Sequence, residues 1–337
     1  MARKWMVLLL ALVLAVTLAA GCGKGAGEGR KAADQGAGDK IKKVVFMLDW
    51  VPNTNHTGIY VAKEKGYFAQ KGLDVEIVQP SQGGTTDLVA TGKAQFGVSS
   101  QEEITMARAA GVPLVSIATV IQHNTSGFAS KKEINIKSPG DFEGKRYGGW
   151  GSASEEAMLR AVMQKAGADP TRLKMINIGT ADFFTAINRD IDFGWIFYAW
   201  TGIEAELRGL PLNVIWLKDL DPALDYYTPL LFASEQVIKN DPKLARDFLA
   251  AASMGYNFAA ENPDQAAEIL LKQVPELNSE LVKKSQKWLS PKYKDDAARW
   301  GEQKKEVWQN YTNWLDQQKL LPGKVEVEKA FTNEFLP

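Results

Sequence analysis

Strand-like and helix-like segments alternate along the chain from residue 44 to residue 121, and no other feature restricts the fold as much. Short runs rich in β-branched and aromatic residues at 44–48, 73–79, 96–99 and 114–121 indicate buried strands. The intervening segments 56–65, 85–91 and 102–110 have the spacing of helices. Regular alternation of this kind predicts a mostly parallel sheet with helices on both faces.

A second run of the same kind follows. Strands are expected at 126–131, 147–150, 173–178, 193–198 and 213–217, with helices at 154–166 and 181–188 and a short helix ending at Arg208. A strand at 227–232 leads back, and 235–319 is expected to be helical, with Pro263 starting one helix and Pro291 breaking another.

The chain therefore crosses between two halves near 122–128 and again near 226–233. We expect an α/β fold of two lobes joined by a two-strand hinge. The first lobe would comprise 41–122 plus 230–337 and the second 123–229, with a ligand cleft that closes between them.

The N-terminal residues have the pattern of a secretory signal. Arg3 and Lys4 precede an uncharged apolar run from 5 to 20, and Gly21 and Cys22 follow it. We therefore expect a lipoprotein signal peptide at 1–21, a lipid attached to Cys22 and a flexible tether at 22–40. The protein would be anchored in a bacterial cell membrane on its extracytoplasmic side. Ordinary signal cleavage, giving an unanchored product, is the alternative.

Composition argues against a nucleic-acid partner, an internal disulfide and a histidine-rich metal site. Lysine and arginine total 40, as do aspartate and glutamate, so the formal net charge is zero and nucleic acid is not expected as a partner. Cys22 is the only cysteine, which excludes an internal disulfide, and the only histidines, His56 and His123, are too few for a histidine-rich metal site. We expect a monomer without metal, in which His123 has a structural role beside the hinge.

The first polar loop, 49–56, follows the strand at 44–48. It contains the candidate ligand-binding residues Asp49, Trp50, Asn53, Asn55 and His56. Ligands bind past the carboxyl ends of strands in open α/β sheets, which favours a binding role. The alternative is a capped turn, with Thr54 or Asn55 as the N-cap of the following helix and Asp49 merely solvated.

Two further loops are expected at the same cleft. Ser99 and Ser100 end a strand and open a helix, so their hydroxyl and amide groups could bind acceptor atoms of a ligand, although Ser100 alone suits a plain N-cap. Trp150 lies in the glycine-rich turn 148–155, which could hold an anion but lacks the lysine and spacing of a nucleotide P-loop.

The fourth loop is the aromatic run 195–204. Trp195 and Phe197 are expected to be core residues of a strand, whereas Tyr198 and Trp200 lie past its end and could stack on a heteroaromatic ring. A carboxylate paired with such a stack accepts a hydrogen bond from an exocyclic amine of an aminopyrimidine, and Asp49 is the candidate for that acceptor.

The string from Pro52 to Gly58, with Leu48-Asp49-Trp50 before it and Gly66-Tyr67-Phe68 and Gly72 to Val75 after it, resembles the SsuA/THI5 (NMT1) family. The resemblance covers about residues 41 to 335. It implies a periplasmic binding protein type II-like fold and a receptor that delivers a thiamine-precursor pyrimidine to the permease and ATPase subunits of an ABC importer. In that branch an acid tends to follow the Tyr-x-Trp element, but Thr201 stands there and the next acid is Glu204, which could equally be a solvated helix residue.

Three other functions are considered for this chain: a pyrimidine synthase, a sulfonate carrier and a binding protein for riboflavin. Fungal pyrimidine synthases of this family use a cofactor lysine, a donor histidine and a cysteine cluster, but Ser99 and Glu103 stand at the first two places and the cluster is absent. We therefore expect no enzyme activity and no cofactor. A sulfonate carrier would need Arg or Lys, and the loops 49–56, 97–101, 148–155 and 195–204 contain neither. Riboflavin, another flat heterocycle, suits the aromatic content about as well.

Overall fold

A computed structural model describes residues 41–80, 84–179 and 181–337. The expected signal peptide 1–21, Cys22 and the tether 22–40 lie outside these residues. The first sheet, sheet A, has the order β2 (Leu73–Val78), β1 (Lys42–Met47), β3 (Phe96–Ser99), β10 (Leu230–Ser234) and β4 (Leu114–Thr119). β1 pairs in parallel with β2 and β3, and β10 is antiparallel to both of its neighbours. Four strands therefore run in one direction, which confirms a mostly parallel sheet.

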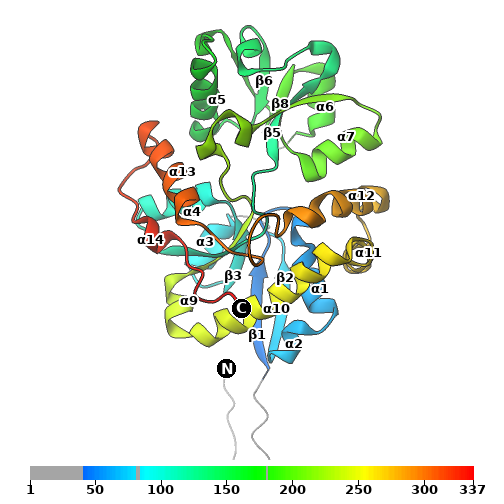
Figure 1. The fold of residues 1–337 in the computed structure, drawn as a ribbon, viewed down its shortest axis with the longest axis vertical. Helices are drawn as coiled ribbons and strands as arrows, with labels where there is room; N and C mark the ends of the chain where they lie inside the picture. Colours follow the sequence, from blue (N-terminus) through cyan, green and yellow to red (C-terminus); the bar gives the residue numbers. More distant parts are fainter. Residues whose placement is uncertain (1–40, 81–83, 180) are drawn as a thin grey trace, which may run out of the picture. The chain divides into compact units, whose positions relative to one another are not determined.

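The second sheet, sheet B, repeats this arrangement. Its order is β7 (Lys174–Asn177), β6 (Arg146–Gly149), β8 (Phe193–Phe197), β5 (Ser126–Lys131) and β9 (Leu212–Trp216), and β5 is antiparallel to β8 and β9. The chain leaves sheet A after β4, forms sheet B and returns as β10 (Figure 1). The α/β fold of two lobes is confirmed.

Helices cover both sheets. Around sheet A these are α1 (Thr57–Glu64), α2 (Tyr67–Gln70), α3 (Thr85–Ala90), α4 (Gln101–Ala109), α9 (Glu235–Asn240), α10 (Pro242–Glu261), α11 (Pro263–Gln273), α12 (Ser279–Leu289), α13 (Lys305–Gln317) and α14 (Val327–Ala330). Around sheet B they are α5 (Ala153–Lys165), α6 (Phe183–Arg189), α7 (Ile203–Leu207) and α8 (Leu217–Leu220). Short 3₁₀ turns are η1 (Thr54–His56), η2 (Lys132–Ile134), η3 (Pro139–Phe142), η4 (Pro170–Arg172), η6 (Pro222–Leu224) and η7 (Ser290–Lys292), and η5 (Tyr198–Gly202) is a π-helical turn.

Most expected elements are present with boundaries shifted by one or two residues. The returning strand starts at Leu230 rather than at 227, directly after Pro229, which has no N–H for a sheet hydrogen bond. Pro263 starts α11 as expected. The helical stretch 235–319 is interrupted from 290 to 304, where Pro291 lies in η7 and the chain then turns without an α-helix.

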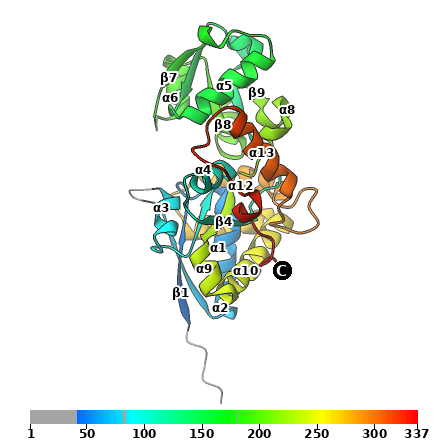
Figure 2. The same cartoon turned by 90° about the vertical axis from the view of Figure 1, so that its left-hand side faces the viewer.

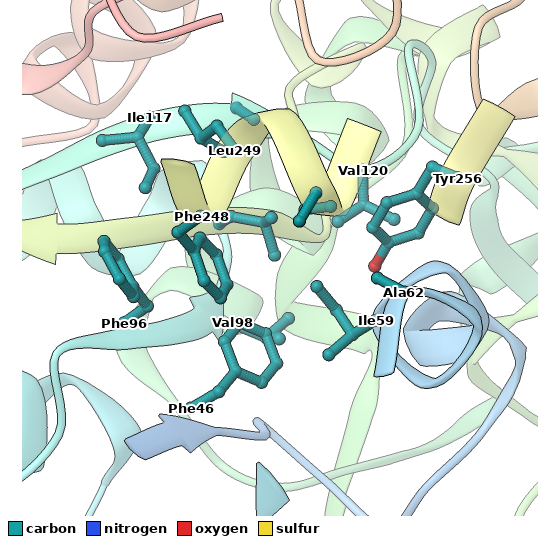
Figure 3. Packing of buried hydrophobic residues seen from close by; sticks show 14 of the residues in the cluster. Phe46, Ile59, Ala62, Phe96, Val98, Ile117, Val120, Phe248, Leu249 and Tyr256 are labelled. Carbon is teal, nitrogen blue, oxygen red and sulfur yellow. The ribbon is translucent and has the colours of Figure 1, made fainter. Parts of the chain in front are cut away.

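The alternation of side chains along β1 places core residues on both faces of sheet A. Val44 and Phe46 face one cluster, in which Phe248 of α10 stacks on Phe96 with ring centroids 4.1 Å apart (Figure 3). Met47 faces the other cluster, formed with α3, α4, α13 and α14. Because both faces are covered, the loops at the ends of the strands hold the polar side chains.

Helix α13 packs with both lobes. Trp308 belongs to the cluster on sheet A, whereas Tyr311, Trp314 and Leu315 belong to the cluster around Phe128 of sheet B. Figure 2 shows α13 beside α4. An amphipathic helix of this length can bury its apolar residues against two cores. The division of the chain into lobes at 122 and 230 stays a prediction.

The described residues 41–80, 84–179 and 181–337 form one compact unit. Across residues 41–80, 84–179 and 181–337, no helix combines the length and apolarity needed to cross a membrane.

Candidate ligand-binding site

The loop 49–56 leaves the carboxyl end of β1, next to β3. Its start is held by Thr85 of α3, whose hydroxyl donates to the Leu48 carbonyl at 2.6 Å. Asn53 caps η1: its side-chain oxygen accepts from the Asn55 N–H at 2.9 Å, and its amide group donates to the Val51 carbonyl at 3.0 Å. Thr54 and Asn55 are therefore not the N-cap of α1: both lie inside η1, which Asn53 caps, and α1 begins after His56, whose side chain makes no capping hydrogen bond to α1.

His56 is completely buried and uses both ring nitrogens inside this loop. Nδ1 accepts a hydrogen bond from the Asn53 N–H at 3.2 Å, so Nδ1 carries no proton. Nε2 must then carry the proton, and it donates to Oδ1 of Asp49 at 2.7 Å. The neutral imidazole therefore both caps its own loop and orients Asp49.

Asp49 and Trp50 present the free surface of the loop. The Asp49 side chain is about one-third exposed, and none of the described residues hydrogen-bonds its second oxygen, Oδ2. The Trp50 side chain is 57% exposed, which is unusual for tryptophan. A fixed carboxylate beside an exposed indole is suited to a flat ligand that donates a hydrogen bond from its edge.

The loop is supported from behind by residues of the C-terminal helices. The Tyr293 hydroxyl donates to the Thr54 carbonyl at 2.6 Å, and the Tyr256 hydroxyl donates to the Asn55 carbonyl at 2.8 Å. Both tyrosines are fully buried. The loop is therefore anchored by buried hydrogen bonds and is not a freely solvated turn.

Ser285 of α12 joins this loop to the π-turn η5 of the other lobe. Its hydroxyl donates to the Ala199 carbonyl, and it lies 2.6 Å from the Thr54 hydroxyl. Since Ser285 has one hydroxyl proton, Thr54 is the donor to Ser285. The structure thus links two of the four predicted loops through a residue that the sequence did not single out.

The loop after β3 is bonded internally. Ser99 is buried, and its hydroxyl donates to the Glu103 carboxylate at 2.5 Å, while Ser100 caps α4 by accepting from the Glu103 N–H at 3.2 Å. The capping role of Ser100 is therefore confirmed. Whether either hydroxyl also contacts a ligand stays a prediction.

The glycine-rich turn 148–155 already holds a carboxylate of the protein. Glu155 accepts from the Tyr147 hydroxyl at 2.6 Å and from the Gly151 N–H at 3.0 Å, and Gly151 has a left-handed φ of +81°. Burial raises the pKa of Glu155, against these hydrogen bonds that lower it. The place where a phosphate could have bound is thus occupied by Glu155, because the turn closes on its own helix.

Trp150 projects from the same turn and is 47% exposed. Its ring lies 5.2 Å from the ring of Trp195, and its N–H donates to the Ser152 hydroxyl at 3.1 Å. Trp195 is half-buried, and its own N–H has no partner among the residues that the structure describes. The exposed indole of Trp150, after the carboxyl end of β6, therefore packs on a half-buried indole from the middle of β8.

The expectation that Phe197 is a core residue is wrong. Ile196 is the buried residue, at 3% exposure, and Phe197 is 42% exposed. The alternation along β8 is shifted at its end, where η5 begins and the backbone leaves the sheet. Phe197 is therefore a third exposed aromatic residue at a strand end, after Trp50 and Trp150.

Tyr198 lies among protein rings. Its ring is 5.0 Å from that of Trp216 and 5.2 Å from that of Trp288, and its hydroxyl donates to Glu206 at 2.5 Å. Burial, with Glu206 as a smaller cause, raises the pKa of Tyr198 to about 12. A hollow beside it is lined by Gly202, Glu206 and other residues of the sheet B half, and includes none of 49–56.

Of the other residues of the fourth loop, one packs against a buried cluster and the others lie partly exposed. Trp200 packs against the cluster that contains Tyr60, and Thr201 is half-buried. Glu204 forms an ion pair with Arg208 one helical turn later, which is the solvated helix role.

Sequence reasoning did not single out Glu102 and Glu155, which lie in the first turns of α4 and α5. Each follows a capping serine within the first turn of a helix, where acids commonly interact favourably with the helix dipole, so their position alone carries no functional signal. Across the described residues, no group of three or more His, Cys, Asp or Glu side chains could hold a metal ion.

The chain is similar in sequence to several known proteins. The chain is 29% identical over 306 residues to a formylaminopyrimidine-binding protein of Halalkalibacterium halodurans. The aligned region covers 88% of this chain and 91% of that protein. It is 27% identical over 300 residues to a 4-amino-5-hydroxymethyl-2-methylpyrimidine phosphate synthase of Legionella pneumophila, covering 88% and 92%.

Among solved structures, the periplasmic aliphatic sulphonate binding protein SsuA from Escherichia coli matches with a TM-score of 0.66 at 17% identity, over 85% of this chain and 91% of that one. This likeness establishes the periplasmic binding protein fold. The family model described as NMT1/THI5 like matches residues 53–266, a span that starts at the capping residue Asn53 and includes strands of both sheets. The chain therefore belongs to the NMT1/THI5-like family.

Proposed function

We propose that the protein is the solute-binding receptor of an ABC importer and that it captures a thiamine-precursor aminopyrimidine between its two lobes. The lobes are 41–122 plus 230–337 and 123–229, with α13 shared between them. Cys22 carries the lipid that anchors the protein outside the cell membrane, and the loaded receptor docks on permease and ATPase subunits. The similarity to a formylaminopyrimidine-binding protein supports this ligand class.

The observation that carries the proposal is the arrangement of Asp49, His56 and Trp50. His56 holds Oδ1 of Asp49, which leaves Oδ2 to accept a hydrogen bond from an exocyclic amine. The exposed indole of Trp50 supplies a flat apolar surface for a heteroaromatic ring. The loops 49–56, 97–101, 148–155 and 195–204 contain no lysine or arginine, which disfavours phosphate and sulfonate ligands.

Binding without chemistry is favoured by the loop after β3. Ser99 and Glu103 stand where the synthases of this family are expected to have their lysine and histidine, and these two side chains bond to each other. A serine hydroxyl cannot form the Schiff base that a pyridoxal cofactor requires. The protein is accordingly a receptor with no cofactor.

Calorimetric titration of the protein starting at Lys40 tests the ligand class. The panel is hydroxymethylpyrimidine, its aminomethyl and formylamino relatives, thiamine, riboflavin and taurine. Micromolar or tighter binding of an aminopyrimidine alone is expected. Binding of riboflavin or taurine alone would contradict the proposed ligand while leaving the fold unaffected.

Three variants of one loop test the geometry. Asp49→Asn keeps an oxygen for His56 but removes the charge, and it should weaken aminopyrimidine binding about 10- to 100-fold, the value of about 1.5–3 kcal/mol for a hydrogen bond to a charged group. Trp50→Ala should weaken all ring ligands at least about tenfold. Val51→Ala, at an exposed neighbour, is the matched control and should bind normally. Equal affinities for Asp49→Asn and the control would refute the acceptor role.

A further inference from the structure

Helix α12 lies against η5 and α7, the segment that continues from the end of β8 (Figure 1). Ser285 of α12 is completely buried, and its hydroxyl donates to the Ala199 carbonyl of η5. The Nζ atom of the preceding residue, Lys284, lies 2.7 Å from a carboxylate oxygen of Glu206 in α7. The segment is therefore bonded to a helix that packs around sheet A, although it follows a strand of sheet B.

Apolar packing holds η5 in the same place. Ala199 is buried in the hydrophobic cluster on sheet A, to which Leu289 of α12 also belongs. The Trp200 side chain packs against the cluster that contains Tyr60 of α1 and Val282 of α12. Movement of η5 away from α12 would expose these apolar surfaces to water, at a cost that grows with their area. Burial and hydrogen bonding therefore both hold η5 on the sheet A half of the protein.

The same serine also holds the first candidate loop. Thr54 lies in the loop 49–56, which carries the exposed indole and the oriented carboxylate, and its hydroxyl is 2.6 Å from that of Ser285. Since the single hydroxyl proton of Ser285 is donated to Ala199, Ser285 accepts from Thr54. One chain of hydrogen bonds thus runs from the loop 49–56 through α12 to η5.

We propose that Ser285 is a positioning residue of the ligand site, which fixes η5 relative to the loop 49–56 and so assembles two of the four candidate loops before a ligand binds. The ligand part of this inference rests on the proposed function, whereas the coupling of the two loops is a property of the ligand-free protein. Without Ser285, only a fraction of the molecules keeps the two loops aligned, and the apparent affinity falls in proportion to that fraction. Ser285 acts here without touching the ligand.

Amide hydrogen exchange of the ligand-free protein, followed by mass spectrometry, measures the coupling directly. In Ser285→Ala, exchange should be about two- to tenfold faster in both Thr54–His56 and Tyr198–Gly202, the effect of losing about one neutral hydrogen bond. Ser116→Ala is the matched control, because Ser116 of β4 is also completely buried and its hydroxyl donates to the Gln303 side chain at 2.7 Å. The control should leave exchange in both segments unchanged.

Calorimetric titration with hydroxymethylpyrimidine and its formylamino relative measures the effect on binding. Ser285→Ala should bind about two- to tenfold more weakly than the wild type, and Ser116→Ala should bind normally. Thr54→Val breaks the same chain of hydrogen bonds at its other link, so it should cause a similar loss of affinity and similarly faster exchange. The double variant should lose no more affinity than either single variant. Urea denaturation shows whether each variant is folded.

Unchanged exchange in Tyr198–Gly202 of Ser285→Ala would overturn the proposal, whatever the ligand. An increase that extends equally to β6 and β7 would also overturn it, because it would indicate general destabilisation. Additive losses of affinity in Thr54→Val and Ser285→Ala would show two independent contacts and have the same consequence. Failure of the wild type to bind either pyrimidine would contradict the proposed function instead, and the exchange result would still decide whether Ser285 couples the loops.

Discussion

Replacement of Tyr293 by phenylalanine tests whether the ligand loop is held by buried hydrogen bonds. The hydroxyl of Tyr293 donates to the Thr54 carbonyl at 2.6 Å and accepts from the Gln286 side-chain amide at 3.1 Å. Both partners keep one other hydrogen bond: the Thr54 carbonyl accepts from the Thr57 N–H, and the Gln286 amide donates to Ser290. The substitution therefore removes two bonds without leaving a polar group wholly unpaired.

The expected cost follows from those two bonds. A neutral hydrogen bond contributes about 0.5–1.5 kcal/mol net, so Tyr293→Phe should lower the free energy of unfolding by about 1–3 kcal/mol. Urea denaturation followed by circular dichroism measures this, with the m-value expected to stay unchanged because the folded core is the same. Tyr256→Phe loses one bond, to the Asn55 carbonyl, and should cost about half as much.

The matched control is Tyr67→Phe, because the hydroxyl of this half-buried tyrosine has no hydrogen-bond partner among the described residues. Tyr67→Phe should leave the free energy of unfolding unchanged within about 0.5 kcal/mol. If Tyr293→Phe were no less stable than this control, the loop 49–56 would not depend on its buried support.

Three further outcomes are expected. Gly58→Ala should cost about 1–3 kcal/mol in urea denaturation, because its Cβ would overlap the Tyr256 ring, whereas Gly140→Ala meets only an ordinary contact and should be neutral. Asp192→Asn should destabilise the protein at pH 7 in thermal unfolding. Arg146 lowers the pKa of Asp192 in the folded protein. The stability difference between the wild type and Asp192→Asn should therefore disappear as the pH falls through this lowered pKa, because Asp192 then loses its charge. Tyr198→Phe should bind the proposed ligand within about twofold of wild type by calorimetry, since its hydroxyl bonds Glu206.

Much of the fold was predictable because it depends on local pattern. The strand and helix order followed from apolar periodicity, and the cap at Ser100 followed from a serine directly before a helix. The exposed Phe197 was not predictable from alternation. The π-turn η5 begins directly after it and removes the end of β8 from the regular sheet.

For the candidate site, the sequence by itself determined that an acid, an indole and an imidazole follow β1, and that the four strand-end loops lack lysine and arginine. The tautomer of His56 and the free oxygen of Asp49 needed coordinates, although the residues are only seven apart. Local sequence identifies the functional groups but does not determine which of their atoms form hydrogen bonds.

Only the tertiary structure decided how the loops are joined. Ser285 is 231 residues from Thr54 and 86 from Ala199, yet it bonds both. The ring of Tyr198 likewise contacts the rings of Trp216 and Trp288, which are distant in the sequence. The packing of α13 against both lobes arises in the same way. Burial and hydrogen bonding depend on which side chains the folded chain brings together, and sequence spacing carries no measure of that proximity.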